Sequence, residues 1–252
     1  MKRGEGNKRA QVTIFIIVAL LIIAAIVVFF LFRGNTNTGN GSPEISPIYT
    51  KTLSCLESTT KEGVKYVALQ GGYYNIPEEL SVYYLAEEVP YYYLDSKTTI
   101  PSILKVEDEL ESYISENLKL CIDFDNLKEQ GFEVTEGDLL ISVDINDDEI
   151  NVKADYPLTL KKGEDISRLR EFKADIPSNL QREYSTSQEI VNSYYQKPGF
   201  VCMTCLDDIS EKYDVQIKAT PLSDVPSTGK NIIWFSILDS ENDLKWRFAV
   251  EQ

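Results

Sequence analysis

The sequence predicts an α+β protein: an N-terminal transmembrane helix followed by an extracytoplasmic domain of helices and antiparallel β-hairpins. Three observations support this fold class. An uncharged apolar run covers residues 12–32. Beyond it, helical and strand periodicities come in blocks, without the alternating βαβ order of a nucleotide-binding sheet. All four cysteines follow the apolar run, as expected for a domain in an oxidising compartment.

The apolar run is long enough to cross a membrane as one helix. At ~1.5 Å per residue it spans about 31 Å, which matches the hydrocarbon core of a bilayer. Four basic residues precede it, whereas only Arg33 follows closely. The positive-inside rule therefore predicts a cytoplasmic basic tail at residues 1–11 and places the bulk of the chain outside the cell membrane.

A cleaved secretory signal is the competing interpretation of this run. Such signals have an apolar stretch of ~7–15 residues and a small-x-small cleavage site after it. The run here is longer, and residues 29–33 offer no such site. A retained single-pass anchor is therefore favoured over cleavage after the run.

Residues 8–15 resemble the class III signal of archaeal type IV pilin-like proteins. The resemblance implies that a prepilin peptidase cuts before the apolar helix, between Ala10 and Gln11. Pilins usually carry a glutamate five residues into the mature chain, where this sequence has Phe15. Their helix also commonly continues into the head, whereas a linker follows here. Both departures favour a tethered anchor over a filament core.

A second resemblance covers residues 10–160. Residues 54–57, residues 70–73, residues 100–102 and Cys121 together are similar to uncharacterised single-pass surface proteins of archaea. The resemblance implies a compartment and a fold but no activity.

A flexible linker is predicted at residues 33–47, which are rich in glycine and asparagine. Asn40-Gly41-Ser42 is the only N-x-S/T sequon with a non-proline middle residue. Asn40 is therefore a candidate glycosylation site on an exposed loop.

Beyond the linker we expect a helical subdomain with a tyrosine-rich hairpin at residues 48–125. Its helices are predicted at residues 48–70, ended by Gly71-Gly72, and at residues 101–120. Its strands are predicted at residues 81–85 and 91–94, with Glu87, Glu88 and Pro90 in the turn between them.

An α+β subdomain is predicted at residues 126–252. Helices are expected at residues 178–196 and 202–212. Strands are expected at residues 132–134, 139–145, 150–154, 158–162, 170–176, 215–219, 232–238 and 245–250.

The charge of the chain is strongly negative beyond the membrane. Residues 1–33 hold five of the 25 basic and one of the 40 acidic residues, which leaves 20 basic and 39 acidic residues and a net charge of −19 in residues 34–252. Such a charge repels nucleic acid and anionic lipid headgroups, so we expect no nucleic-acid partner. It suits a solvated surface that attracts cations or basic partners.

The sequence argues against most kinds of enzyme, although carboxylate pairs and Ser-Lys dyads remain possible. The chain has no histidine, which removes Ser-His and Cys-His nucleophile pairs and histidine-ligated zinc. The G-x-S-x-G, Walker, H-E-x-x-H and G-x-G-x-x-G motifs are all missing. We therefore expect no catalytic residues, no cofactor and no metal.

The four cysteines are expected to form disulfides, since their number is even and their domain is extracytoplasmic. A bridge between Cys55 and Cys121 would close a loop of about 65 residues and stabilise the fold by ~3–4 kcal/mol. Cys202 and Cys205 would then pair locally. The C-x-x-C spacing at a helix start also fits a redox site, and both pairs together fit a metal site.

Two acidic segments resemble cation-binding loops. Residues 144–149 place oxygen ligands at alternate positions, as at the start of a calcium loop. They lack the glycine expected sixth, and they fall where a hairpin turn is predicted. A plain turn is favoured there and at residues 239–243.

The tyrosine-rich stretch is the candidate surface for a protein partner or glycan, because tyrosine offers an apolar face and a polar tip. The alternative, which is favoured, is that these side chains pack the hairpin onto the helices. The candidates are Tyr73, Tyr74, Tyr83, Tyr84, Tyr91, Tyr92 and Tyr93.

Together these observations predict a membrane-anchored surface protein with a structural or interaction role, which includes a pilin-like subunit that self-assembles or binds a protein partner. One alternative is a membrane-tethered thiol–disulfide oxidoreductase that uses Cys202 and Cys205. Another is a surface module that binds a ligand or cation.

Overall fold

The computed structural model describes residues 46–84, 86–223, 225–226, 228–239 and 243–252. The predicted basic tail, transmembrane helix and Asn40 lie outside these residues. In the described part of the chain, no helix combines the length and apolarity needed to cross a membrane. Residues Ile45–Gln252 form one compact unit.

The unit has the mixed α+β fold that the sequence predicts. Its helices are α2 (Ser46–Leu69), α3 (Ile103–Ile122), α4 (Phe124–Glu129), α5 (Leu180–Gln196) and α6 (Met203–Tyr213), with a 3₁₀ turn η1 at Glu78–Leu80. Its strands are β1 (Ser81–Tyr84), β2 (Glu87–Leu94), β3 (Lys97–Thr98), β4 (Glu133–Glu136), β5 (Leu140–Ile145), β6 (Glu149–Lys162), β7 (Asp165–Pro177), β8 (Gln216–Leu222), β9 (Ile232–Asp239) and β10 (Leu244–Glu251).

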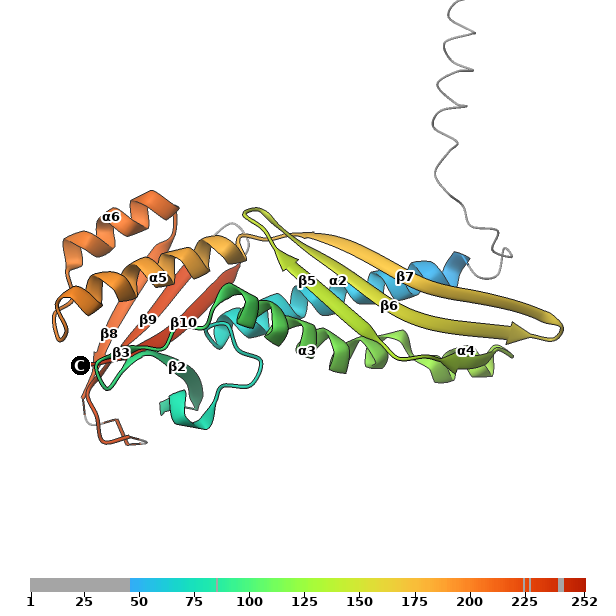
Figure 1. The fold of residues 1–252 in the computed structure, drawn as a ribbon, viewed down its shortest axis with the longest axis horizontal. Coiled ribbons are helices and arrows are strands. Elements are labelled where there is room, and N and C mark those ends of the chain that lie inside the picture. Colours follow the sequence, from blue (N-terminus) through green and yellow to red (C-terminus); the bar gives the residue numbers. More distant parts are fainter. Residues whose placement is uncertain (1–45, 85, 224, 227, 240–242) are drawn as a thin grey trace, which may run out of the picture. The chain divides into compact units, whose positions relative to one another are not determined.

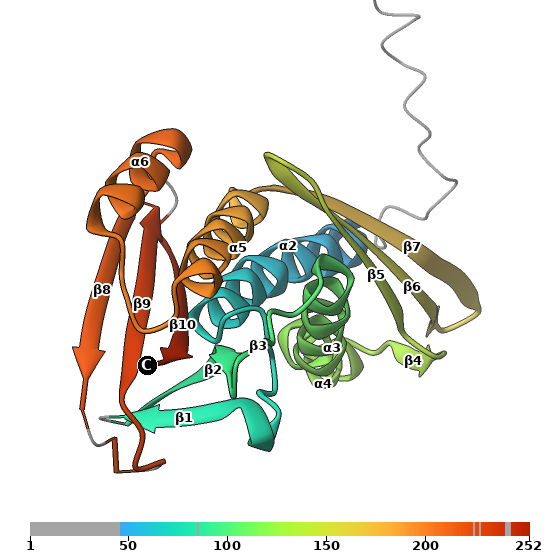
Figure 2. The same ribbon diagram turned by 60° about the vertical axis from the view of Figure 1, so that its left-hand side comes forward.

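These strands form two separate sheets, which α2 connects. The larger sheet has the order β1-β2-β10-β9-β8, with β3 beside β2, and in the smaller sheet β6 pairs with β4, β5 and β7. The pairing is antiparallel except between β2 and β10, which run parallel. Helix α2 packs against β7 of one sheet and β10 of the other, and α5 covers the larger sheet (Figures 1 and 2).

The start of β2 differs from the sequence prediction. Glu87, Glu88 and Pro90 are strand residues rather than turn residues, and they pair with Tyr84, Tyr83 and Ser81 of β1. The turn is shorter and includes Ala86 at a φ of 65°. Pro90 is tolerated because the register with β10 begins one residue later, at Tyr91.

Strand β6 also differs from the prediction. The sequence suggests two strands, at residues 150–154 and 158–162, but one strand runs through both. Its register with β7 shifts between Asp155 and Leu158, so a bulge carries the strand across Pro157. The short helix α4 was not predicted.

The interior of the larger sheet is built on aromatic side chains. The rings of Tyr92, Phe248 and Phe235 stack across three neighbouring strands, with centroid distances of 4.5 and 5.1 Å. The Tyr92 hydroxyl donates to the carbonyl of Gly71 at 2.7 Å and accepts from the indole nitrogen of Trp246 at 3.1 Å. This core draws on both ranges that were predicted as subdomains.

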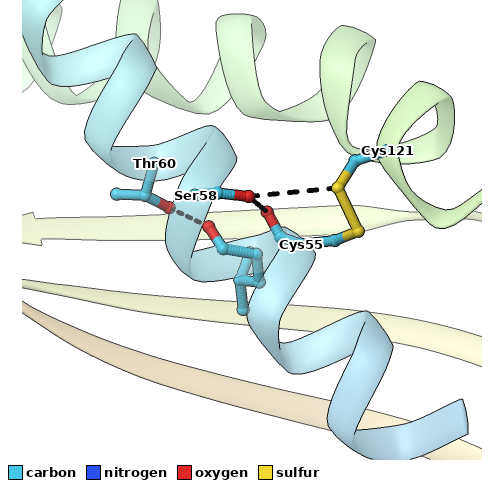
Figure 3. The surroundings of a disulfide bond; sticks show 5 residues. Cys55, Ser58, Thr60 and Cys121 are labelled. Carbon is cyan, nitrogen blue, oxygen red and sulfur yellow. Dashed lines mark hydrogen bonds between the residues drawn. A yellow bond between two sulfur atoms is a disulfide. The ribbon is translucent and has the colours of Figure 1, made fainter.

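A disulfide between Cys55 and Cys121 joins the middle of α2 to the end of α3 (Figure 3). The Ser58 hydroxyl donates to the Cys55 carbonyl at 3.2 Å and lies 3.9 Å from the Cys121 sulfur. The Thr60 hydroxyl donates to the carbonyl of Leu56 at 2.7 Å, so both hydroxyls bond to their own helix. The bridge holds α2 and α3 together at the level of the smaller sheet.

A carboxyl group is buried on the inner face of α5. Glu183 is fully buried, and neither of its oxygens has a hydrogen-bond partner among the described residues. Asp239 at the end of β9 is also buried, with Asn179 donating to it at 2.8 Å and Arg182 lying 2.9 Å away. Burial, reinforced by the charge of Asp239, raises the pKa of Glu183 to about 8.

The raised pKa of Glu183 predicts a pH-dependent stability. The carboxyl of Glu183 has a pKa of 4.5 in the unfolded chain and about 8 in the native state. Below pH 4.5 it is protonated in both states and does not reduce the free energy of unfolding. Between pH 4.5 and 8 the unfolded chain loses the proton first, so the free energy of unfolding falls as the pH rises. We expect Glu183→Gln to remove this loss, so that its advantage over the wild type grows by ~1.4 kcal/mol per pH unit across the window. Urea unfolding at pH 5, 7 and 9 measures it.

The matched control is Glu211→Gln, which changes an exposed carboxyl on α6. Its unfolding free energy should keep the pH dependence of the wild type. Parallel pH profiles for Glu183→Gln and the wild type would contradict the burial of an unpartnered carboxyl on α5.

Candidate functional site

The two faces of the larger sheet are covered differently. Even-numbered residues of β8 and β9 and odd-numbered residues of β10 share the outer face, as the register requires. Part of this face is sealed by a small core in which Val82 and Val89 of the β1–β2 hairpin pack with Trp234 and Ala249. The part of the outer face towards the end of β9 remains open.

The open part is a groove of about 540 Å³. Strands β8, β9 and β10 form its floor, and the turn of the β1–β2 hairpin contributes to its wall. The residues that line it are Tyr84, Glu87, Gln216, Ile217, Lys218, Thr220, Leu222, Trp234, Ser236, Leu238 and Lys245.

Arg247 fixes the wall of the groove to its floor. Its side chain is almost buried, with one guanidinium nitrogen 2.6 Å from Glu87 and Nε donating to the carbonyl of Leu69 at 3.1 Å. The guanidinium carbon lies 5.9 Å from the ring centroid of Trp234. The position of the groove is therefore set by bonds to the end of α2, the start of β2 and the middle of β9.

The groove is cationic in a strongly acidic chain. The side chains of Lys218 and Lys245 are exposed, and neither forms an ion pair with another described residue. Lys218 lies opposite Ser236 and Lys245 opposite Leu238, so two strand spacings and two residues separate their Cα atoms, about 12 Å. Because Glu87 is neutralised by Arg247, the two lysines give the groove a net positive charge.

The other lining groups offer polar and apolar contacts to a ligand. Gln216, Thr220 and Ser236 offer amide and hydroxyl groups, while Tyr84 and Leu238 offer apolar surface. Within the described lining, the only carboxylate belongs to Glu87, which is held by Arg247.

The seven candidate tyrosines do not share one surface. Tyr73, Tyr91, Tyr92 and Tyr93 are buried. Tyr74 packs edge-on against the rings of Tyr66 and Tyr113. Tyr83 is exposed and Tyr84 lines the groove, so these two have side chains placed for contact with a ligand.

The groove lysines were missed at the sequence level. The alternation in the three closing strands was the available signal, because it puts Lys218, Ser236 and Lys245 on the face opposite the aromatic core. That face cannot be recognised as a site until the strand register is known.

The remaining predicted site residues lie elsewhere. Cys202 and Cys205 are joined to each other at the start of α6, and Cys55 and Cys121 join two other helices, so the four sulfurs do not form one metal centre.

Residues 144–149 contain the β5–β6 turn, in which the Asn146 backbone N–H donates to the Glu149 carbonyl at 2.9 Å. Over the described part of the chain, no cluster of three or more metal-ligating side chains occurs.

No protein-family model, curated protein or solved structure matches the chain. The geometry of the groove is therefore the main guide to function.

The contacts of Arg247 predict that lysine cannot replace it. Lysine keeps the charge opposite Glu87 but cannot also reach the Leu69 carbonyl and cover the Trp234 ring, because its ammonium is a single point of contact. We expect Arg247→Lys to lower the unfolding free energy by about 2 kcal/mol, measured with urea.

Arg170→Lys is the matched control, since Arg170 is exposed and pairs with Asp155 on the surface of the smaller sheet. It should cost less than about 1 kcal/mol. Equal losses for the two variants would show that Arg247 has no special structural role.

Proposed function

We propose that the chain is a membrane-anchored extracytoplasmic module that binds an acidic, extended ligand in the groove of the larger sheet. The observation that carries this proposal is the pair of exposed lysines, Lys218 and Lys245, on the floor of a preformed groove in a chain of net charge −15. A surface this acidic keeps anions away elsewhere, so a local cationic groove selects where an anion binds.

The lining chemistry favours an acidic glycan as the ligand. The two lysines match carboxylate or sulfate groups spaced along a chain, because their Cα atoms lie about 12 Å apart on the same face of the sheet. Hydroxyl and amide groups from Thr220, Ser236 and Gln216 match sugar hydroxyls. The Tyr84 ring offers a surface on which the apolar face of a sugar packs.

The N-terminal segment supports a location at the membrane. The apolar run at residues 12–32 and its basic flank fit a single anchor with the groove-bearing domain outside. The linker was predicted at residues 33–47, but α2 already begins at Ser46. The composition of residues 33–45 predicts a tether with a span of about 20 Å, which holds the domain away from the bilayer. This reach suits a module that contacts material outside the cell.

Titration calorimetry of the full-length chain in neutral detergent micelles tests the proposal. The probe is polygalacturonate, a carboxylated polysaccharide, and its methyl-esterified form is the uncharged control. We expect binding of the acidic form only, weakened by salt because exposed charges are screened. Lys218→Glu and Lys245→Glu should each weaken binding about tenfold, which corresponds to ~1.4 kcal/mol.

Lys51→Glu, which reverses an exposed lysine on α2, is the control variant and should bind like the wild type. Binding that is unchanged in Lys218→Glu and Lys245→Glu contradicts the groove as the site. Equal binding of poly-glutamate and polygalacturonate would keep an acidic ligand but overturn the choice of a glycan.

The N-terminus offers a further test. The missing glutamate at Phe15 and the linker both favour a tethered anchor over a filament core, and we propose that this anchor keeps residues 1–10. Intact-mass measurement of the chain purified from membranes of an archaeal host with a prepilin peptidase should then give the mass of the complete chain. Loss of residues 1–10 would instead support a processed, pilin-like subunit.

A further inference from the structure

The Cys202–Cys205 disulfide lies at the start of α6, outside the groove. Cys202 is the N-cap residue of this helix, and its sulfur accepts from the backbone N–H of Cys205 at 3.3 Å. The Thr204 hydroxyl lies 3.5 Å from the same sulfur. Two hydrogen-bonding groups and the positive end of the helix therefore converge on Cys202 Sγ, an environment that stabilises a thiolate.

The segment that leads into this disulfide exposes three large apolar side chains. Tyr195, Phe200 and Met203 are 54%, 61% and 61% exposed, and all three fall within nine residues around the cysteine pair. Large apolar side chains exposed together are typical of surfaces that contact other polypeptides, and methionine adapts to varied partners. The segment lies at the opposite end of the domain from the start of α2 (Figure 1).

The second disulfide of the chain has a different environment. Cys55 is 5% exposed and its bridge lies between α2 and α3. Cys202 and Cys205 are both partly exposed, and Met203 and Thr204 between them are exposed. Cys121 of the second disulfide is exposed, but it lies in the last turn of α3, where the negative end of the helix disfavours a thiolate. Cys202 lies at the positive end of α6, so the two bridges differ in how well they stabilise a leaving thiolate.

We propose that Cys202 and Cys205 form a thiol–disulfide exchange site whose substrate is an unfolded polypeptide segment that carries two thiols and apolar side chains. The exposed side chains of Tyr195, Phe200 and Met203 hold this segment beside the disulfide. The activity is independent of ligand binding in the groove.

The exchange takes place in two steps. A substrate thiolate attacks Cys202 Sγ, so that a mixed disulfide forms, the Cys202–Cys205 bond breaks, and Cys205 leaves as a thiolate that takes a proton from water. The second substrate thiolate then attacks the substrate sulfur of the mixed disulfide, and Cys202 leaves as a thiolate. The substrate dithiol loses two electrons to form a disulfide, and the cysteine pair gains them.

The hydrogen bonds to Cys202 favour oxidation of the substrate in these two steps. Because the Cys205 N–H and the Thr204 hydroxyl stabilise negative charge on Cys202, this sulfur is the better leaving group in the second step. The step consumes one disulfide per substrate, and a single turnover therefore needs no other oxidant.

Single-turnover oxidation of a synthetic peptide tests the proposal with the full-length oxidised chain in detergent micelles. The probe is an unstructured peptide with two reduced cysteines flanked by phenylalanine and leucine. After acid quenching, mass spectrometry should find one peptide disulfide formed per chain and reduced thiols at Cys202 and Cys205 only. The Cys55–Cys121 bridge is the internal control and should remain intact.

Two variants separate the chemistry from the docking. Thr204→Val should slow exchange about threefold to tenfold with both the peptide and the small dithiol dithiothreitol, because Cys202 loses a stabilising hydroxyl. The double variant Phe200→Ser/Met203→Ser should slow exchange with the peptide about fivefold or more and leave the rate with dithiothreitol unchanged.

A third variant identifies the attacked sulfur. Cys205→Ser leaves Cys202 as a free thiol, which should form a stable mixed disulfide with an oxidised peptide. The proposal is overturned if Cys202 and Cys205 are reduced no faster than Cys55 and Cys121, or only in denaturant. Lys218→Glu should leave all these rates unchanged, so failure here and failure of the groove are separate outcomes.

Discussion

The contacts of Arg247 tie together the parts of the chain that form the groove. One side chain bonds to the last turn of α2 through the Leu69 carbonyl, pairs with Glu87 at the start of β2, and covers the ring of Trp234. The backbone around it is equally constrained, since a Cβ on Gly71 would lie 2.5 Å from the Arg247 carbonyl oxygen. Glycine at φ 57° allows α2 to end where Arg247 reaches it.

The parallel pairing of β2 with β10 gives the sheet two different faces. On the inner face, the rings of Tyr92, Phe248 and Phe235 stack on one another, and α5 packs against the strands that carry them. On the outer face the β1–β2 hairpin folds over part of the sheet, and the remainder stays open as the groove. The buried aromatic side chains supply the stability of the domain, and the outward residues of the same strands are thereby free to serve binding.

Local features of the fold were predictable from the sequence. Helix α3 was expected at residues 101–120 and runs from Ile103 to Ile122, because Ser102 caps it and its apolar residues keep a helical period. The β5–β6 turn and both cysteine pairings also agree with expectation. These features depend on residues close in sequence or on the few ways in which four cysteines can pair.

Features that depend on long-range register were not predictable. The parallel β2–β10 pair joins residues more than 150 positions apart, and it buries Tyr91, Tyr92 and Tyr93 on the two faces of the sheet. Lys218 and Lys245 approach each other only through β9, and Glu183 meets Asp239 only through the packing of α5 on the sheet. No local pattern distinguishes these residues from ordinary surface charges.

Hydrogen–deuterium exchange of the full-length chain, with and without polygalacturonate, tests the groove most directly. The account predicts that peptides from β8, β9 and the start of β10 exchange more slowly when the polysaccharide is bound, while those from α3, α6 and the smaller sheet do not change. Protection confined to α6 or to the smaller sheet, or no protection in any strand of the groove, would contradict it.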